Sequence, residues 1–182
     1  GGSCDSTIHV DLECLADPDV VSAGEIKAAL EAKILPNRIV FSGVGKTSEE
    51  LKYAISNNIS QINIESESEL YEIIKISKQL KKVTNISFRV NPNISNAENN
   101  TKISTGGKQN KFGISFDKTE ELIRKTLKEK KCIKFVGLSI HIGSQMLNLE
   151  KTRLAFQSLK SFVNKLENNG ISIETLDLGG GL

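Results

Sequence analysis

The chain has 182 residues, of which 38% are hydrophobic and 5% aromatic, and its formal net charge is +2 at pH 7. This length suffices for one domain with a buried core. The nearly balanced charge and scarce aromatics exclude the basic stripe that is typical of nucleic-acid-binding proteins, and the apolar runs are far too short to cross a membrane. The three cysteines form no C-x-x-C pair and the first residues are polar. We therefore expect a reduced, cytoplasmic protein without a signal peptide.

Short apolar segments alternate with helical patterns along the chain. The segments are rich in Ile, Val and Phe, as buried strands are, and they lie near Val20, Val40, Asn63, Phe88, Gly137 and Leu176. The helical patterns have apolar residues at i, i+3, i+4 and i+7 spacing and cover residues 24–33, 48–57, 67–80, 118–130 and 149–168. Six strands alternating with five helices predict a parallel sheet.

Four of the predicted helices start with a capping-box pattern, in which Ser, Thr or Asp is followed three residues later by Glu. The pairs are Ser22/Glu25, Thr47/Glu50, Ser66/Glu69 and Asp117/Glu120. The regular alternation is interrupted at 91–116, which is long, polar and rich in Asn. A connection of this length inside a compact domain is usually functional or disordered.

Polar or glycine residues end every predicted strand. They are Ser22, Ser42 with Gly43, Glu65 with Ser66, Arg89 with Asn91, His141 with Ser144, and Asp177 with three glycines. An open doubly wound sheet needs such residues only near a switch point, whereas a TIM barrel builds its active site from the carboxyl ends of all its strands. The pattern therefore predicts a barrel. Six strands cannot close an eight-stranded barrel, so we expect part of one.

The segment IVFSGVGKTSEE superficially suggests a nucleotide-binding P-loop. A P-loop requires G-x-x-x-x-G-K-[ST]. Gly45, Lys46 and Thr47 match its last three positions, but the first glycine would fall at Val40. The loop is therefore too short to surround a phosphate with backbone N–H groups. The segment predicts a strand, a tight turn and a capped helix.

Three further segments carry polar residues suited to chemistry. LDLGGGL ends a strand in glycines, whose backbone can approach a phosphate. IHIGSQ places His141 at a strand end without Cys or His at metal-ligand spacing, so zinc is not expected and stacking on an aromatic cofactor is favoured. SFRVNP places Arg89 within an apolar strand, where its charge requires an ion-pair partner or a ligand.

Together, these segments resemble the diaminopimelate decarboxylases, which belong to the alanine-racemase-like class of enzymes that use pyridoxal 5'-phosphate. The resemblance runs from Asp19 to Leu182, with residues 1–18 unmatched. It rests on DVVSAGEI, RIVFSGVGKTSEEL, INIESESEL, ISFRVNP, ISTGGKQNKFGI, GLSIHIGSQ and LDLGGGL. Ornithine and arginine decarboxylases are similar in their barrel and their His-x-Gly-Ser stretch, but STG…NKFG combined with GVGKT favours the diaminopimelate branch.

The resemblance implies a TIM barrel followed by a β-domain, with residues 19–182 forming roughly strands 2 to 7 of the barrel. It implies that His141 stacks on the cofactor ring, with Arg89 and Asp19 supporting the ring. The residues implied to hold the cofactor phosphate are Ser144, Gly179, Gly180 and Gly181. The implied reaction converts meso-2,6-diaminopimelate to L-lysine and CO2, the last step of lysine biosynthesis, in a homodimer that binds neither nucleic acid nor membrane.

The resemblance also implies what the chain lacks. The family's Schiff-base lysine lies in a Tyr-x-x-Lys-Ala stretch before DVVS, whereas the first lysine here is Lys27, and Lys46 does not match that position. We therefore expect no catalytic residue in this chain, and an inactive fragment when it stands alone. Two alternatives stay open. They are an ornithine- or arginine-type basic amino acid decarboxylase, and a non-catalytic homologue that acts by binding.

Overall fold

The computed structural model describes residues 17–92, 113–141 and 149–179. The strands are β1 (Asp19–Val20), β2 (Val40–Phe41), β3 (Gln61–Ile64), β4 (Thr84–Asn91), β5 (Ile114–Ser115), β6 (Ile133–His141) and β7 (Thr175–Gly179). The helices are α1 (Ala23–Glu31), α2 (Ser48–Ser56), α3 (Glu67–Leu80), α4 (Phe116–Thr126) and α5 (Leu149–Asn168), with a 3-10 turn, η1 (Pro36–Arg38), before β2.

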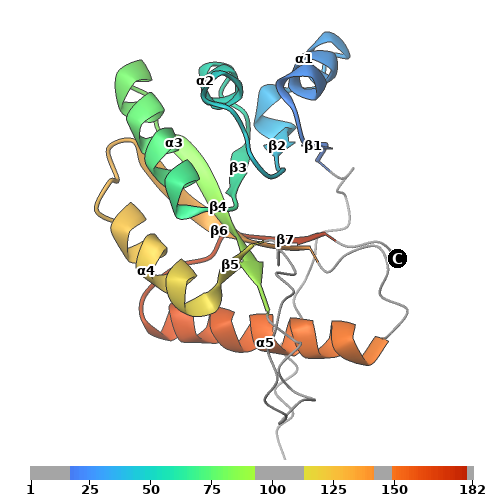
Figure 1. Ribbon diagram of the computed structural model, residues 1–182, viewed down its shortest axis with the longest axis vertical. Helices are drawn as coiled ribbons and strands as arrows, with labels where there is room; N and C mark the ends of the chain where they lie inside the picture. Colours follow the sequence, from blue (N-terminus) through green and yellow to red (C-terminus); the bar gives the residue numbers. More distant parts are fainter. Residues whose placement is uncertain (1–16, 93–112, 142–148, 180–182) are drawn as a thin grey trace, which may run out of the picture.

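All strands run parallel in one sheet. The strand order is β1-β2-β3-β4-β6-β7, and β5 pairs with the end of β4. The five helices lie on the outer side of this sheet, following one another around it from α1 to α5 (Figure 1). Among the described residues the sheet does not close, because β1 pairs only with β2 and β7 only with β6. This architecture confirms the predicted partial TIM barrel.

The sheet is strongly curved, as hydrogen bonds across its inner face demonstrate. Asn63 Nδ2 on β3 lies 2.8 Å from Asp177 Oδ2 on β7, and Thr175 Oγ1 lies 3.2 Å from Gln61 Oε1. Two strands, β4 and β6, stand between β3 and β7 in the sheet. Neighbouring parallel strands are about 4.8 Å apart, so these side chains can meet only across the inside of a barrel-like curve.

The core lies between the strands and the helices. The strands contribute fully buried apolar side chains to it, at Phe41, Ile62, Ile64, Ile86, Phe88, Leu138 and Ile140, and the helices contribute Ile26, Leu51, Leu70, Ile73, Leu122, Ile123 and Ala155. Burying one side chain of this size stabilises the fold by about 1.5–3 kcal/mol. Along β3 these residues alternate with Gln61 and Asn63, so the face of this strand that lies inside the curve is polar.

Of the four predicted capping boxes, Thr47/Glu50 is complete, two are confirmed as helix caps only, and one is wrong. The side-chain oxygens of Ser22, Thr47 and Ser66 each accept a hydrogen bond from the backbone N–H three residues later. Glu25 and Glu69 accept from the backbone N–H of the residue before the cap instead. Asp117 is not a cap, because α4 begins at Phe116 and its N-cap, Ser115, makes no side-chain capping bond. The two-residue strand β5 fixes the chain directly before Phe116 and thereby moves the helix start forward.

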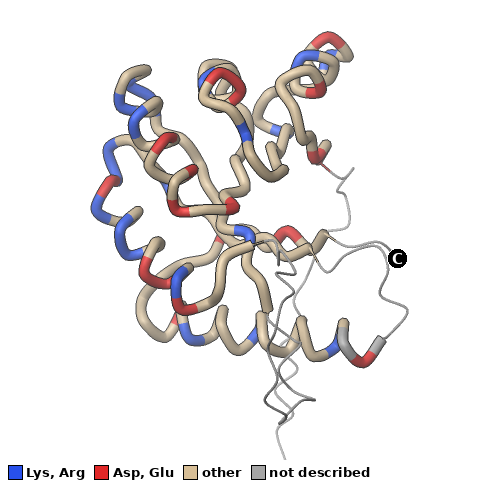
Figure 2. The backbone as a smooth tube through the Cα atoms, in the orientation of Figure 1, with Lys and Arg blue, Asp and Glu red and all other residues tan. Residues whose placement is uncertain are grey.

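Two further details differ from the sequence-based expectations. The strand β5 was not predicted, because two residues carry no periodicity. The last strand spans Thr175–Gly179, as expected near Leu176, but the apolar Ile171 and Ile173 before it lie outside the strand and pack against the core. Both signs of charge are interspersed along the helices (Figure 2). None of the helices in the described part of the chain is long and apolar enough to cross a membrane.

Candidate functional site

The carboxyl ends of the strands surround a small polar hollow. The residues that line it are Asp19, Ser42, Asn63, Glu65, Arg89, Ser139, Ile140, His141, Asp177 and Gly179. Its volume is about 50 Å³, whereas a small-molecule site usually has about 300 Å³ or more. The hollow therefore accommodates only part of a cofactor-sized molecule. Its lining joins four residues predicted from the sequence, Asp19, Arg89, His141 and Gly179, at one place.

The strand register explains why these residues meet. Arg89 on β4 pairs with Ser139 on β6, which in turn pairs with Asp177 on β7. Ile64 pairs with Phe88, so Glu65, the next residue, is level with Arg89. In parallel strands, residues in register point to the same face. The four polar side chains consequently form one row around the inside of the curved sheet.

Arg89 makes a largely buried ion pair. Its Nη1 lies 2.7 Å from Oε1 of Glu65, and the two side chains are 17% and 5% exposed. The sequence left open whether this charge has an ion-pair partner or a ligand. The structure provides the partner, and it also places both residues in the lining of the hollow. Glu65 holds the guanidinium at the edge of the hollow.

Asn63 is a residue of the site that the sequence did not reveal. Its Nδ2 donates to Ser42 Oγ and to Asp177 Oδ2, each at 2.8 Å. Its Oδ1 accepts from Ser87 Oγ at 2.7 Å and from Gln61 Nε2 at 2.9 Å. Both hydrogens and both acceptor positions of the amide are thus used. Asn63 is 2% exposed, and its side chain links β3, β4, β7 and Ser42, the residue that follows β2.

Asp19 and Asp177 bring two carboxylates to the hollow. Burial and the nearby Asp177 carboxylate raise the pKa of Asp19, while a hydrogen bond with Ser42 and the charges of His141 and Lys46 oppose the rise. Asp19 is nevertheless exposed to water, and this screens its interactions. The raised pKa of Asp19 still indicates that this part of the site disfavours a further negative charge.

His141 and Gly179 lie side by side at the ends of β6 and β7. They are partners in the strand register, and a Cβ added to Gly179 would lie 3.0 Å from His141 Nδ1. A larger residue at 179 would therefore displace the imidazole. His141 is exposed to solvent at the rim of the hollow. The other predicted phosphate contacts, Ser144, Gly180 and Gly181, lie outside the described residues.

The GVGKT turn has a structural role. Gly43 and Gly45 have φ values of 103° and 75°, which glycine adopts without steric cost. The side chain of Lys46 is 1% exposed, and its Nζ donates to Gly43 O at 2.8 Å, Asn63 O at 2.7 Å and Glu69 Oε1 at 2.7 Å. Its three N–H groups are thus used inside the protein, whereas the lysine of a P-loop reaches the phosphates of its nucleotide.

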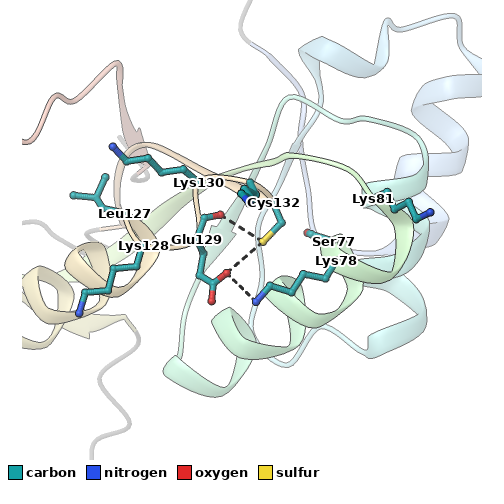
Figure 3. Close-up of a pocket in the computed structure, with 9 residues that line it drawn as sticks. Ser77, Lys78, Lys81, Leu127, Lys128, Glu129, Lys130 and Cys132 are labelled. Atoms are coloured by element: carbon teal, nitrogen blue, oxygen red, sulfur yellow. Dashed lines mark hydrogen bonds and ion pairs between the residues drawn. The ribbon is translucent and has the colours of Figure 1, made fainter.

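A larger cavity of about 700 Å³ lies at the opposite end of the strands, between α3 and the segment that follows α4. Figure 3 shows that Lys78 points toward Glu129, whereas Lys81, Lys128 and Lys130 point away from the centre. Lys78 and Glu129 form an ion pair of 2.8 Å. A ligand site requires converging polar groups, and these lysines diverge. Throughout the described ranges, no group of His, Cys, Asp and Glu could hold a metal ion.

Comparison with known proteins identifies the family. The family model described as "Pyridoxal-dependent decarboxylase, pyridoxal binding domain" matches residues 14–182. The chain belongs to this family. The predicted resemblance to pyridoxal-phosphate decarboxylases is thereby confirmed, and the polar hollow occupies the end of the decarboxylase domain at which TIM barrels carry their active sites.

Relatives of this decarboxylase domain share its sequence and its fold. It is 43% identical, over 164 residues, to a diaminopimelate decarboxylase of Zymomonas mobilis, covering 90% of this chain and 38% of that protein. The crystal structure of Methanocaldococcus jannaschii diaminopimelate decarboxylase with L-lysine matches with a TM-score of 0.78 and 39% identity, over 90% of this chain and 38% of that one. The chain thus spans about 38% of the length of these relatives.

A solved arginine decarboxylase is a more distant relative. The enzyme of Paramecium bursaria Chlorella virus matches with a TM-score of 0.70 and 27% identity, over 90% of this chain and 41% of that one. The fold is therefore shared across decarboxylases that are named for different substrates, while the sequence is more similar to the diaminopimelate enzymes.

Proposed function

We propose that the protein containing this chain is a diaminopimelate decarboxylase, which converts meso-2,6-diaminopimelate to L-lysine and CO2. Identity of 43% and 39% to diaminopimelate decarboxylases, against 27% to an arginine decarboxylase, supports this choice of substrate. An ornithine- or arginine-type activity is the second candidate, because the shared fold accommodates both. A non-catalytic homologue is the third.

The residues of the hollow fit pyridoxal 5'-phosphate. Two buried polar atoms there, Glu65 Oε2 and Ser139 Oγ, have no hydrogen-bond partner. Leaving such an atom unpaired costs about 1–3 kcal/mol, so the site favours a ligand with polar groups. Gly179 leaves room beside His141 Nδ1, which a Cβ at this position would approach to 3.0 Å, and the exposed imidazole would cover an aromatic ring bound at the rim. Ser144, Gly180 and Gly181 would hold the phosphate.

The residues of this chain would bind the cofactor and orient its ring. When bound, pyridoxal phosphate supplies the electron sink that accepts the electron pair left by the departing CO2. His141 would cover one face of the ring and exclude water from it. The Arg89–Glu65 pair and Asp19 would fix the edge of the ring, because each is held by an interaction with a neighbouring strand or loop. Asn63 would keep Asp177 in place.

The assembly and location of the protein are proposals as well. A homodimer with shared active sites and a cytoplasmic location follow from the resemblance to biosynthetic decarboxylases. Residues 19–182 would form an incomplete part of the pyridoxal-binding domain, whose family match begins slightly earlier, at residue 14. The substrate would be a free amino acid, because similar decarboxylases are named for amino acids and one was solved with L-lysine. The balanced charge does not favour nucleic acid as a partner.

The full-length protein tests the proposal. It is incubated with pyridoxal phosphate and with meso-diaminopimelate, L-ornithine or L-arginine, and the amine products are separated. We expect lysine from diaminopimelate and little product from the other two. The His141→Ala variant should bind the cofactor more weakly and turn over more slowly, whereas Lys75→Met, at an exposed position on α3, should match the wild type. Unchanged lysine formation by His141→Ala would exclude the stacking role.

A further inference from the structure

Two buried polar atoms of the hollow lack partners. They are Glu65 Oε2 and Ser139 Oγ, and the described part of the chain contains no other buried side-chain oxygen or nitrogen in this state. The Glu65 side chain and Ser139 are each 5% exposed, and both line the same hollow. Buried polar atoms are nearly always paired. Two unpaired polar atoms that line one cavity therefore indicate that a polar group binds there.

The surroundings define the chemistry of this group. Glu65 Oε2 belongs to a carboxylate whose other oxygen pairs with Arg89, so it accepts a hydrogen bond. The Ser139 hydroxyl both donates and accepts, and it is next to Arg89 in the strand register. An anion is disfavoured by the carboxylates of Glu65, Asp19 and Asp177, and a cation would lie beside the Arg89 guanidinium. The exclusion of anions and cations leaves a neutral group that both donates and accepts a hydrogen bond. A hydroxyl is the smallest group of this kind.

The size of the hollow supports the same group. Its volume of about 50 Å³ exceeds the space that one water molecule needs, which is about 30 Å³ in the liquid, and is far below that of an aromatic ring. We propose that Glu65 and Ser139 form a subsite for a single hydroxyl group. The hydroxyl is supplied either by a bound water molecule or by the ring hydroxyl of pyridoxal phosphate, and the second source rests on the proposed function.

Ser139→Ala is the informative variant, because it removes the hydroxyl and disrupts no other hydrogen bond that the structure describes at Ser139 Oγ. Ser77→Ala is its matched control. Ser77 is likewise buried, but its Oγ has a partner, Thr84 Oγ1 at 2.6 Å, at the opposite end of β4. The full-length protein is used for wild type and both variants. The melting temperature is measured without cofactor, and the affinities for pyridoxal 5'-phosphate and its 3-deoxy analogue are measured from cofactor absorbance.

Each source of the hydroxyl predicts a different result. If the ring supplies it, Ser139→Ala binds pyridoxal phosphate about 2- to 10-fold more weakly, the effect of one hydrogen bond, and binds the 3-deoxy analogue as the wild type does. If water supplies it, Ser139→Ala lowers the melting temperature of the cofactor-free protein and changes neither affinity. A crystal structure then has a water within hydrogen-bond distance of both atoms. Ser77→Ala should lower the melting temperature and leave both affinities unchanged.

The subsite is disproved if Ser139→Ala leaves both affinities unchanged and melts at the same or a higher temperature, because removing a truly unpaired buried hydroxyl relieves a cost. It is also disproved if a side chain from another part of the protein fills the hollow. Failure of the proposed function has a different signature: the wild type then binds neither cofactor form. In that case the melting temperatures and the crystal structure alone decide whether water occupies the subsite.

Discussion

The buried ammonium of Lys46 is a sensitive point of the fold, and Lys46→Met tests it. Methionine keeps most of the side-chain length and removes the charge. The variant loses hydrogen bonds to two backbone carbonyls and to Glu69, whose side chain is 8% exposed and would stay buried without its cation. Removing one partner of a buried ion pair costs about 3–5 kcal/mol. Because Glu69 Oε2 keeps its bond from the backbone N–H of Glu65, we expect a loss of about 3 kcal/mol.

Urea unfolding of the full-length protein, followed by circular dichroism, measures this loss. Lys75→Met is the matched control, since Lys75 is 62% exposed and pairs with Glu72 at 3.3 Å on the surface of α3. Such surface pairs contribute about 0–1 kcal/mol, so the control should be nearly as stable as the wild type. The double variant Lys46→Met/Glu69→Leu should regain most of the lost stability, because it leaves no buried charge unpaired.

Two results would refute this reasoning. A Lys46→Met protein within about 0.5 kcal/mol of the wild type, the range of ordinary surface substitutions, would mean that the buried ammonium contributes nothing. A double variant no more stable than Lys46→Met would mean that the loss comes from packing or from the two carbonyl bonds rather than from the unpaired carboxylate of Glu69.

Three further changes test other parts of the structure. Burial raises the pKa of Asp19 above its ordinary 3.8, so its ionised form destabilises the fold as pH rises through the raised pKa. Asp19→Asn should therefore melt higher than the wild type at pH 7 but not below pH 3.8, and equal differences at both pH values would contradict this. Gly137→Ala should lower the melting temperature or prevent folding, because the new Cβ would clash with the backbone oxygen of Thr175. Gly24→Ala is the control. No atom lies within 3.7 Å of its Cβ, so this substitution should leave the melting temperature unchanged or raise it. Hydrogen bonds with Lys118 and Lys125 lower the pKa of Glu67 to about 2. An NMR titration of Glu67 should give this pKa at low salt and a higher pKa in 1 M salt, because salt screens exposed charges. A pKa that does not change with salt would argue against these exposed pairs as the cause.

Apart from β5, the order of strands and helices was readable from the sequence, because local patterns determine it. Buried parallel strands are rich in β-branched and apolar residues, such as Ile62 and Ile64 in β3, and this signal lies within a few neighbouring residues. The caps at Ser22, Thr47 and Ser66 were readable for the same reason, since each bond spans three residues. The Asp117 cap was wrong because a tertiary contact, the pairing of β5 with β4, fixed the helix start instead.

The general position of the site was also readable. Every strand of a parallel barrel ends at the same edge, so polar residues at successive strand ends must gather there. This rule predicts from residue positions alone that Arg89, His141 and Asp177 lie together, and all three do line one hollow. Asp19 also lines it, but only the family resemblance implied that. The partner of Arg89 could not be read, because Glu65 lies 24 residues away and several other acidic residues were equally available.

The sequence by itself determined which segments form strands, which end of them is polar, and which family the motifs resemble, because these depend on residue type and short-range spacing. Only the tertiary structure decided that the Asn63 side chain contacts both Ser42 and Asp177. Asp177 lies 114 residues after Asn63 in the chain. The tertiary structure likewise decided that Lys46 turns inward to Glu69, and that Glu65 and Ser139 each keep one polar atom unpaired. Such contacts depend on the curvature of the sheet and the register of its strands, which bring side chains together regardless of their separation in sequence.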